Sequence, residues 1–321
     1  MSSEAPSFED ILQAAKRIAP YVHRTPVMTC TAINLLAGAE VFFKCENLQK
    51  VGAFKIRGAT NAVYSLADNQ TASGVCTHSS GNHAAALAQA ARWRGMTATV
   101  VMPDNAPLPK KKAVAGYGAK IIFCEPTLKA RQDTLAKVVA ETGAVVVHPY
   151  NDSRVIAGQA TAVLELHDQV HDLDAVITPV GGGGLLSGTA LSVNAISNTT
   201  RVYGAEPENV NDAFASLESG KIMPATGKKT IADGLLTCLG DITFPIIQKH
   251  VKGILTVSET EIIDAMRLIW ERMKLIVEPS SAVALAAVLK NPQEFSGERV
   301  GIILSGGNVD LDGLPWVING A

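Results

Sequence analysis

A chain of 321 residues is long enough to bury two compact lobes, and 47% of its residues are apolar. Only 18% are charged and the net charge is −2, which argues against nucleic acid or an acidic membrane surface as a partner. The longest apolar run, around AVALAAVL, is far shorter than a bilayer span, and the N-terminus lacks the pattern of a signal peptide. We therefore expect a cytoplasmic location and a small-molecule partner.

The five cysteines are scattered through apolar segments and form no C-x-x-C pair. An odd, dispersed set of this kind is typical of reduced packing residues rather than of a disulfide framework or a zinc site. Free thiols are the expectation.

The first predicted element is an amphipathic helix that begins after Ser7 to Asp10, a sequence typical of a helix cap. After it, short Val- and Ile-rich segments alternate with helix-length segments, which predicts an α/β fold with mostly parallel sheets flanked by helices. The predicted strands are EVFFKCE, GVCTHSS, TATVVMP, AKIIFCE, AVVVHPY, DAVITPVGG, RVYGAEP, GILTVS and VGIILSGGN. We expect residues 74–148 to form an inserted small domain, and residues 1–73 and 149–321 to form the large domain.

Polar or glycine-rich segments follow four of these strands. They are Ser79–His83, Gly181–Gly184, Glu206–Pro207 and Ser305–Asn308. Because ligands bind at the carboxyl ends of parallel strands, we expect these segments to meet a ligand at one rim.

The run Gly181–Gly184 is not a nucleotide motif. Leu186 and Ser187 interrupt the dinucleotide pattern, and Thr189 replaces the lysine of a P-loop. Several backbone N–H groups before a helix suit one phosphate monoester, although a tight strand-to-helix turn is the alternative explanation.

Lys55 lies between Phe54 and Ile56 in the segment VGAFKIRG. A lysine among apolar neighbours can lose its proton near neutral pH and form a Schiff base with an aldehyde, although an ordinary exposed lysine is the simpler reading of Lys55 taken alone. An aldehyde that also carries a phosphate monoester is pyridoxal 5′-phosphate.

The motifs GAFKIRG, THSSGNHA, PVGGGGLLSG, AEPENVND, TIADG, WERMKLIVEP and LSGGNVDL occur in this order over nearly the whole chain. Together they resemble the fold-type II pyridoxal-phosphate enzymes, in particular the group of serine racemases, serine/threonine dehydratases and 3-hydroxyaspartate dehydratases. The resemblance implies a tryptophan-synthase-β-like fold and a homodimer.

The resemblance assigns roles around the cofactor. Lys55 would be the Schiff-base lysine, and Ser305 would meet the pyridine nitrogen, where a neutral partner favours elimination over transamination. The expected cofactor-binding residues are Phe54, Lys55, Asn82, Gly181, Gly182, Gly183, Gly184, Leu185, Gly234, Glu278, Ser305 and Asn308.

The resemblance also assigns the substrate site. Ser80 would face Lys55 across the substrate α-carbon, and two such groups can remove and return a proton; a helix-capping hydroxyl is the alternative. The expected contacts to the substrate carboxylate come from Ser79, Ser80, Gly81, Asn82 and His83.

In AEPENVND, the carboxylates of Glu206 and Asp212 and the carbonyl of Val210 match the family's divalent-metal site. Oxygen ligands suit Mg²⁺, Ca²⁺ or Mn²⁺ rather than zinc. Two exposed acids near a helix start are the alternative.

Several residues depart from the common racemase pattern. Ala53 replaces a serine, Ala84 and Ala85 follow SGNH, and Tyr150 replaces an asparagine after His-Pro. Because Ala85 stands where some relatives use a glutamine to bind a nucleotide effector, stimulation by ATP is not expected.

Arg131 and Thr237 are the candidate substrate selectors. Arg131 aligns with an arginine that can reach the active site in this subgroup, and a guanidinium would select a dicarboxylate such as 3-hydroxyaspartate; an exposed helix arginine is the alternative. Thr237 could add a hydroxyl contact.

The function expected from these residues is an ammonia-lyase that dehydrates a β-hydroxy amino acid, with 3-hydroxyaspartate preferred over serine or threonine. Serine racemase with dehydratase activity is the alternative, because both reactions need Lys55 and Ser80. A non-catalytic amino-acid sensor, a cysteine synthase and a nicotinamide oxidoreductase remain weaker readings.

Overall fold

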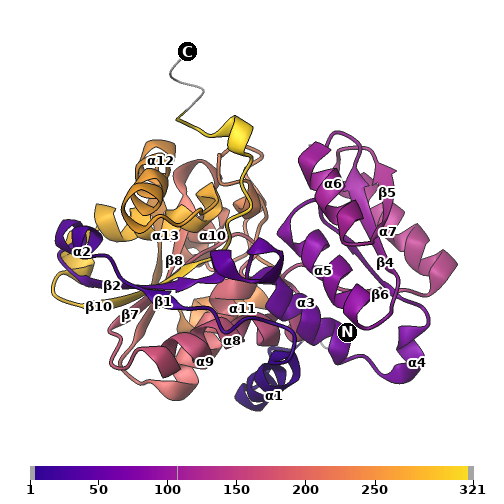
Figure 1. The fold of residues 1–321 in the computed structure, drawn as a ribbon, viewed down its shortest axis with the longest axis horizontal. Helices are drawn as coiled ribbons and strands as arrows, with labels where there is room; N and C mark the ends of the chain where they lie inside the picture. The colour runs from indigo at the N-terminus through magenta and orange to yellow at the C-terminus, as the bar shows by residue number, and fades with distance from the viewer. Residues whose placement is uncertain (1–3, 107, 317–321) are drawn as a thin grey trace.

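The computed structural model describes residues 4–106 and 108–316, whose strands form two separate sheets (Figure 1). The strands of the six-stranded sheet are, in spatial order, β1 (Val27–Met28), β2 (Glu40–Cys45), β10 (Arg299–Leu304), β7 (Ala175–Pro179), β8 (Arg201–Pro207) and β9 (Gly253–Val257). The strands of the four-stranded sheet are β5 (Lys120–Cys124), β4 (Ala98–Pro103), β3 (Val75–His78) and β6 (Val145–Val146). All neighbouring strands are parallel except the pair β1 and β2.

Helices cover both faces of the large sheet, as expected for buried parallel strands. One face packs against α2 (Thr31–Ala37), α12 (Glu259–Leu268), α13 (Pro279–Lys290) and α14 (Pro292–Phe295). The other face packs against α8 (Ser153–Gln169), α9 (Gly184–Ile196), α10 (Asp212–Ser219) and α11 (Thr243–His250). Successive side chains of β10 alternate between these cores: Ile302 packs with the first group and Ile303 with the second.

The small sheet also has helices on both faces. Its side chains alternate in the same way, since Val100 packs beside α5 (Asn82–Trp93) and α6 (Leu108–Gly116), while Val101 packs beside α7 (Leu128–Thr142). The short helix α4 (Asp68–Thr71) precedes this sheet. We propose that residues 74–148, which include the whole sheet, are the small domain of the chain.

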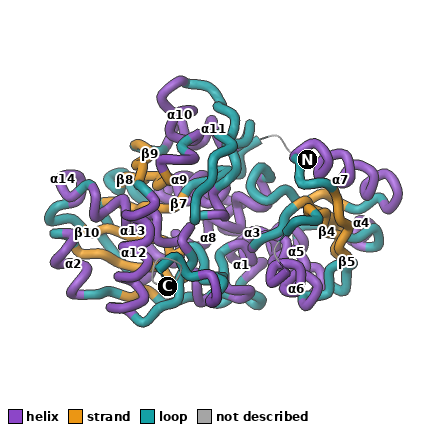
Figure 2. Tube along the Cα trace, turned by 90° about the horizontal axis from the view of Figure 1, so that it is seen from above, coloured by secondary structure: helices purple, strands orange, loops and turns teal. Residues whose placement is uncertain are grey.

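Helix α3 (Lys55–Tyr64) lies between the two lobes in both views (Figures 1 and 2). Its apolar residues Ile56 and Val63 join the core of the small lobe. On the other side, α3 lies against α8, so closely that a Cβ built on Gly158 would stand 2.6 Å from the carbonyl oxygen of Arg57. The backbones of α3 and α8 are therefore in direct contact.

The N-terminal helix α1 (Phe8–Ile18) begins as predicted. Ser7 accepts a hydrogen bond from the N–H of Asp10 at 3.2 Å, and Asp10 accepts one from the N–H of Ser7 at 2.8 Å. Ile11 and Ala14 of α1 pack on Ala157 and Ala160 of α8.

The predicted α/β fold is confirmed, with two corrections. Strand β1 has no counterpart among the predicted strands. The polar strand ends also do not share one rim, because Ser79–His83 follows β3 of the small sheet whereas the other three segments follow β7, β8 and β10 of the large sheet. The candidate site is therefore built by two sheets rather than by one.

All five cysteines are free thiols, as expected. No helix among the described residues combines the length and apolarity needed to cross a lipid bilayer.

We expect the substitution Gly158→Ala to lower the free energy of unfolding by about 1–3 kcal/mol, because the added methyl group would overlap the backbone of α3. The matched control is Gly116→Ala in α6, where a Cβ meets nothing within 4 Å and alanine should add roughly 0.5 kcal/mol. Urea unfolding of both variants measures the effect. Equal stabilities of the two variants would show that α3 and α8 are not in backbone contact.

Candidate active site

Lys55 is the first residue of α3 and is half-buried where the lobes meet. Its Nζ donates a hydrogen bond of 2.8 Å to the carbonyl oxygen of Pro149, in the loop before α8. Burial lowers the pKa of Lys55 to about 8, and the negative charge of Glu278 only partly opposes this change. Near neutral pH a useful fraction of this amine is neutral and can attack an aldehyde.

The turn Ser79–His83 joins β3 to α5. Gly81 is the N-cap of α5, so the N–H groups of Asn82 and His83 belong to the first helical turn and have no acceptor within the helix. A Cβ built on Gly81 would meet no atom within 4 Å, which shows that the turn borders open space. Free N–H groups at a helix N-terminus suit a carboxylate.

The side chain of His83 is occupied by a hydrogen bond within the small lobe and is not available to a ligand. Its Nε2 lies 3.1 Å from the carbonyl oxygen of Val147, and burial lowers the pKa of His83 to about 3, so the ring is neutral and donates through Nε2. Of the donors expected from His83, only the backbone N–H remains available.

Gly181–Gly184 connect β7 to the N-terminus of α9. Gly183 has φ +88°, and a Cβ built on Gly182 would lie 2.3 Å from the ring of Tyr150. The glycines therefore meet the needs of a tight turn, and they also leave the backbone N–H groups at the start of α9 uncovered by side chains. Such a helix N-terminus can hold a phosphate.

Asn82, Glu278 and Asn308 connect the small lobe to the large one. The Asn82 Nδ2 donates to both carboxylate oxygens of Glu278, at 3.0 and 3.1 Å, and the Asn308 Nδ2 donates to the Asn82 Oδ1 at 2.9 Å. The Asn308 N–H also donates to Glu278 at 3.2 Å. Burial raises the pKa of Glu278 to about 7 despite these donors.

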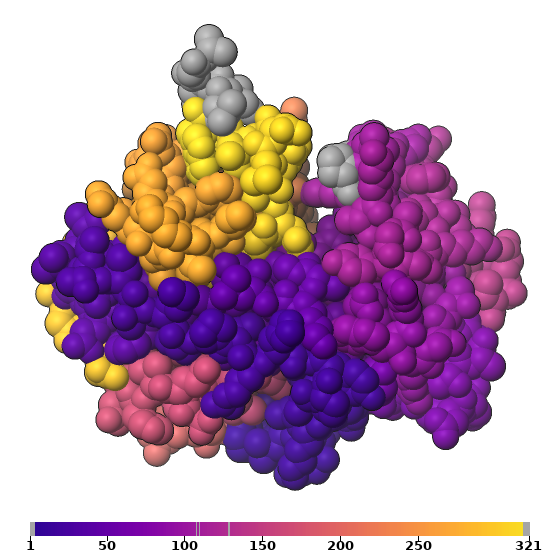
Figure 3. All heavy atoms as spheres, in the orientation of Figure 1, coloured from indigo at the N-terminus to yellow at the C-terminus, as the bar shows by residue number. Residues whose placement is uncertain are grey.

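Ser305 lies at the end of β10, is only 4% exposed, and is bound to the residue before Lys55. Its carbonyl oxygen accepts a hydrogen bond of 3.0 Å from the N–H of Phe54. Gly234 also lies near Lys55, beside Glu278, because a Cβ built on Gly234 would lie 4.0 Å from a carboxylate oxygen of Glu278. The structure thus brings the segments TIADG, VEP and SGGN together around Lys55, and Figure 3 shows a hollow between the C-terminal residues in yellow and the small lobe in magenta.

The two candidate selectors lie in different places. Arg131 on α7 is half-buried and close enough to His78, the last residue of β3, to reinforce the lowering of the His78 pKa that burial causes. Among the described residues, Arg131 has no ion pair. Thr237 instead lies beside the glycine run, 3.3 Å from a Cβ built on Gly181.

Glu206 and Asp212 are both buried at the end of β8 and the start of α10. Glu206 accepts hydrogen bonds of 2.9 Å from the N–H groups of Ala213 and Phe214, whereas neither carboxylate oxygen of Asp212 has a partner in the described part of the chain. Burial raises the pKa of Glu206 to about 8 and that of Asp212 to about 6. An orphaned buried carboxylate in an all-oxygen set fits a hard divalent cation, although no third acidic, His or Cys side chain joins the pair within the described ranges.

Two residues near Lys55, Pro149 and His148, were not predicted. Pro149 supplies the acceptor for its amine, while the ring of His148 lies edge-on to Tyr150 at 4.6 Å and to His78 at 5.7 Å. The available signal was the position of His-Pro-Tyr at the carboxyl end of the predicted strand AVVVHPY.

Residues 18–306 match the protein family described as "Pyridoxal-phosphate dependent enzyme". The chain belongs to this family. Its cofactor is pyridoxal phosphate, and the family expected from the sequence motifs is confirmed.

Similar proteins share nearly the full length of this family member. It is 55% identical to a beta-hydroxyaspartate dehydratase of Paracoccus denitrificans over 97% of this chain and 99% of that protein. It is 46% identical to an L-threo-3-hydroxyaspartate ammonia-lyase of Saccharomyces cerevisiae over 98% of this chain and 97% of that protein. The crystal structure of serine racemase from Dictyostelium discoideum superposes with a TM-score of 0.92 at 50% identity, covering 95% of this chain and 99% of that chain.

The residues of this pyridoxal-phosphate enzyme fit its cofactor. The N–H groups at the start of α9 offer a phosphate site, Lys55 offers a partly deprotonated amine, and Ser305 offers a buried, neutral hydroxyl at the end of β10. These three features come from β7, α3 and β10, all at the side of the large sheet where its strands end.

We expect Glu278→Gln to flatten the pH dependence of stability. An acid whose pKa rises on folding, here from 4.5 to about 7, favours the folded state below pH 4.5, and that contribution is lost as pH rises through about 7. Relative to Glu278→Gln, the parent should lose on the order of 3 kcal/mol of unfolding free energy between these pH values. Urea unfolding at pH 4.5, 6 and 8 measures the difference.

The control for this experiment is Glu125→Gln, since Glu125 is exposed. Its stability should run parallel to that of the parent at all three pH values. A parallel curve for Glu278→Gln as well would contradict a raised pKa of Glu278.

Proposed function

We propose that this enzyme is an ammonia-lyase that converts 3-hydroxyaspartate to oxaloacetate and ammonia. The observation that carries the substrate choice is the guanidinium of Arg131, which has no ion pair in the described structure and lies near His78, next to the turn Ser79–His83. A second substrate carboxylate would supply the missing partner. The names of two relatives, a beta-hydroxyaspartate dehydratase and an L-threo-3-hydroxyaspartate ammonia-lyase, support the same choice.

In this proposal the substrate α-carboxylate binds at the start of α5. The N–H groups of Gly81, Asn82 and His83 and the hydroxyl of Ser79 are its donors, and the open space at Gly81 supports this placement. The side chain of Asn82, whose Nδ2 donates to both carboxylate oxygens of Glu278, has a different proposed task, which is to hydrogen-bond to the cofactor.

Lys55 and Ser80 are the proposed proton-transfer groups. When bound, pyridoxal phosphate withdraws electrons from the substrate α-carbon and so makes its proton acidic. Lys55 Nζ accepts that proton, which its lowered pKa of about 8 permits near neutral pH. The proton that Lys55 has taken from the α-carbon balances the one that the β-hydroxyl needs to leave as water, and one water later cleaves the remaining C=N bond, so the net products are oxaloacetate and ammonia.

The cofactor would be held by the residues around Lys55. Phe54 packs against its ring, Ser305 meets its pyridine nitrogen, and the backbone of Gly181–Gly184 with the Leu185 N–H binds its phosphate. Gly234, Glu278 and Asn308 would border the ring. Their convergence at the end of the large sheet supports these roles.

We also propose a divalent cation, Mg²⁺, Ca²⁺ or Mn²⁺, bound by the carboxylates of Glu206 and Asp212 and the carbonyl of Val210. The unpartnered, buried oxygens of Asp212 support this site. A cation there would neutralise two acids that burial otherwise disfavours, and would fix the segment between β8 and α10.

Serine racemisation is the second candidate function. The similarity to serine racemase of Dictyostelium discoideum favours it, and it would use Lys55 and Ser80 on opposite faces of the α-carbon. Elimination and racemisation then differ in whether the β-hydroxyl leaves before the proton returns.

We further propose that the enzyme is a cytoplasmic homodimer. Leu48 and Ile276 are 47% and 49% exposed, and the Asn47 Nδ2 joins their segments by donating to the Ile276 carbonyl oxygen. Exposed apolar side chains on adjoining segments are typical of an interface. The five free thiols support a reducing compartment.

The proposal predicts rapid oxaloacetate and ammonia formation from one stereoisomer of 3-hydroxyaspartate, with slow turnover of L-serine, threonine and D-serine. Arg131→Lys should lower kcat/KM for hydroxyaspartate by about ten- to a hundredfold, because a lysine loses the bidentate contact, and should change serine turnover little. Ammonia, oxo acid and enantiomer are measured together for the parent and the variant. Serine interconversion that outpaces elimination, with hydroxyaspartate inert, would identify a racemase instead.

For the cation, we expect chelation with EDTA to lower the melting temperature, and Mg²⁺, Ca²⁺ or Mn²⁺ to restore it. Asp212→Asn should remove this response because the amide binds a cation more weakly. The control is Asp264→Asn, a change of charge on α12, which should keep the response. A melting temperature that EDTA leaves unchanged, in protein shown to contain metal beforehand, would contradict the site.

A further inference from the structure

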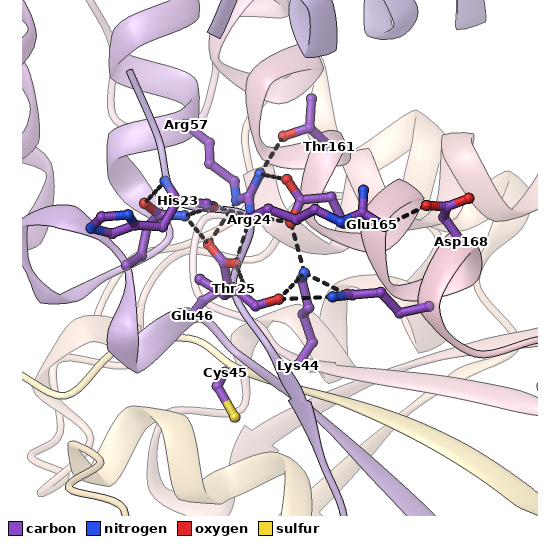
Figure 4. A network of polar contacts seen from close by, with 12 residues as sticks. His23, Arg24, Thr25, Lys44, Cys45, Glu46, Arg57, Thr161, Glu165 and Asp168 are labelled. Carbon is purple, nitrogen blue, oxygen red and sulfur yellow. Dashed lines mark hydrogen bonds and ion pairs between the residues drawn. The ribbon is translucent and has the colours of Figure 1, made fainter. Parts of the chain in front are cut away.

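Two cations and two carboxylates form a buried ionic network beside α3 (Figure 4). Arg57, Lys44 and Glu46 are completely buried, and the Glu165 side chain is 18% exposed. The two positive and two negative charges cancel. The four residues come from α3, β2, the turn after β2 and α8, so the network ties together segments that are far apart in the sequence.

Arg57 is the centre of this network. Its Nε and Nη2 donate to the two carboxylate oxygens of Glu46, at 2.7 and 2.8 Å. Its Nη1 and Nη2 donate to the two oxygens of Glu165, both at 2.8 Å, and Nη1 also donates to the Thr161 hydroxyl at 3.1 Å. The guanidinium therefore makes two bidentate contacts at once, which fixes its plane and position.

Lys44 closes the network on the other side of Glu165. Its Nζ donates to Glu165 at 2.6 Å, to the carbonyl oxygen of Thr25 at 2.8 Å and to the Gln169 side chain at 2.8 Å, which uses all three of its N–H groups. Glu46 in turn accepts a bond of 2.6 Å from the Thr25 hydroxyl. Every charge of the network is paired and hydrogen-bonded.

A network of this kind is poorly explained by stability alone. Removing charges from water is costly, and well-packed apolar residues in place of a buried ion pair are often as stable or more stable. Close packing of α3 on α8 is already achieved at Gly58 and Gly158, where a Cβ on Gly158 would lie 2.6 Å from the Gly58 Cα. The ionic contacts of Arg57 with Glu46 and Glu165 add a further restraint, because they fix how α3 is rotated about its axis and how far along that axis it lies relative to α8.

That position matters for Lys55, which lies on the same helical turn as Arg57. The N-cap of α3, Phe54, makes no side-chain capping bond, so the turn is held from outside the helix. One anchor is the bond from the Phe54 N–H to the Ser305 carbonyl at 3.0 Å, one residue before Lys55. The other anchor is Arg57, two residues after it.

We propose that Arg57 is a positioning residue for Lys55: by binding Glu46 and Glu165 together, it sets the first turn of α3 so that Lys55 Nζ points at the cofactor. The lysine itself touches none of the four ionic residues and hydrogen-bonds to the Pro149 carbonyl instead. Arg57 thus acts through the backbone of α3. The inference rests on the proposed role of Lys55 but not on the choice of substrate.

The charges of Arg57 and Glu46, at the centre of the network, are stabilised by their mutual contact. Burial works against the carboxylate of Glu46, but Arg57, the Thr25 hydroxyl and Lys44 together outweigh it and lower the pKa of Glu46. Burial likewise works against the Arg57 cation, and the contacts with Glu46 and Glu165 raise its pKa. The contact between Arg57 and Glu46 is therefore an ionic one, whereas burial lowers the pKa of Lys44 at the edge of the network.

The test is Arg57→Lys in the cofactor-loaded enzyme. Lysine keeps the positive charge but cannot make two bidentate contacts, so α3 should shift while the charge balance survives. We expect kcat to fall by about a hundredfold, the effect of a displacement near 1 Å, with KM changed less than threefold. The fraction of bound cofactor that borohydride traps on Lys55, read by mass spectrometry, should also fall.

The matched control is Asn61→Ala, on the same helix but nearly two turns beyond Lys55. Asn61 is 2% exposed and joins α3 to α8 through a bond of 2.7 Å from its Nδ2 to the Arg154 carbonyl. The melting temperature of Asn61→Ala should fall about as much as that of Arg57→Lys. Its kcat should stay within about twofold of the parent, and its fraction of trapped cofactor should not change. If Arg57→Lys does not fold, Thr161→Val, which removes one acceptor of Arg57, should give a severalfold loss of kcat.

The outcomes separate two failures. If Arg57→Lys and Asn61→Ala lose the same stability and both keep kcat and the trapped fraction, Arg57 is only structural and the inference is overturned. Lys55→Ala should abolish trapping on α3. If it does not, the proposed role of Lys55 fails whatever the Arg57 variant does.

Discussion

Burial of the Lys55 amine lowers its pKa to about 8, and this desolvation needs both lobes at once. The large lobe contributes the chain before α3, the strand end at Ser305 and the Pro149 carbonyl, while the small lobe contributes His83 and His148, which lie near the Lys55 amine. Within the described part of the chain the amine thus has one acceptor, the Pro149 carbonyl, and no ion pair, and Glu278 acts on it only from a distance. A direct ion pair would restore the ordinary pKa and remove the neutral amine that the chemistry needs.

The same helix contains a second buried basic side chain, Arg57, which is paired with carboxylates and therefore keeps its charge. Arg57 is more deeply buried than Lys55, yet it is surrounded by Glu46 and Glu165 and stays charged. Two cations on one helical turn therefore have opposite surroundings, since one is paired and the other is not. Pairing Arg57 keeps α3 in place, and leaving Lys55 without a close carboxylate keeps it reactive.

Sequence reasoning predicted the parts of the fold that depend on local pattern. The cap at Ser7, the parallel α/β alternation and the polar segments at strand ends follow from periodicity and from residue types near each segment. Strand β1 was missed because a strand of two residues is too short to show an alternation of apolar and polar side chains. Its pairing with β2 is a contact that the sequence pattern does not reveal. The ion pair between Arg57 and Glu165 was also missed. The two residues are 108 positions apart, and the residue type of Arg57 does not indicate which distant carboxylate it contacts. The roles of most site residues came from family motifs rather than from pattern.

The division of the site between two sheets bears on specificity. The proposed phosphate and pyridine contacts come from β7 and β10 of the large sheet, whereas the turn Ser79–His83 and Arg131 come from β3 and α7 of the small lobe. In this proposal Arg131 of the small lobe can change without moving Lys55 or the glycine run, whereas Asn82 of the small lobe and Thr237 beside Gly181 link the two tasks. The Asn82 bond to Glu278 is one of the contacts that join the two halves, and it links the first turn of α5 to the N-cap of α13.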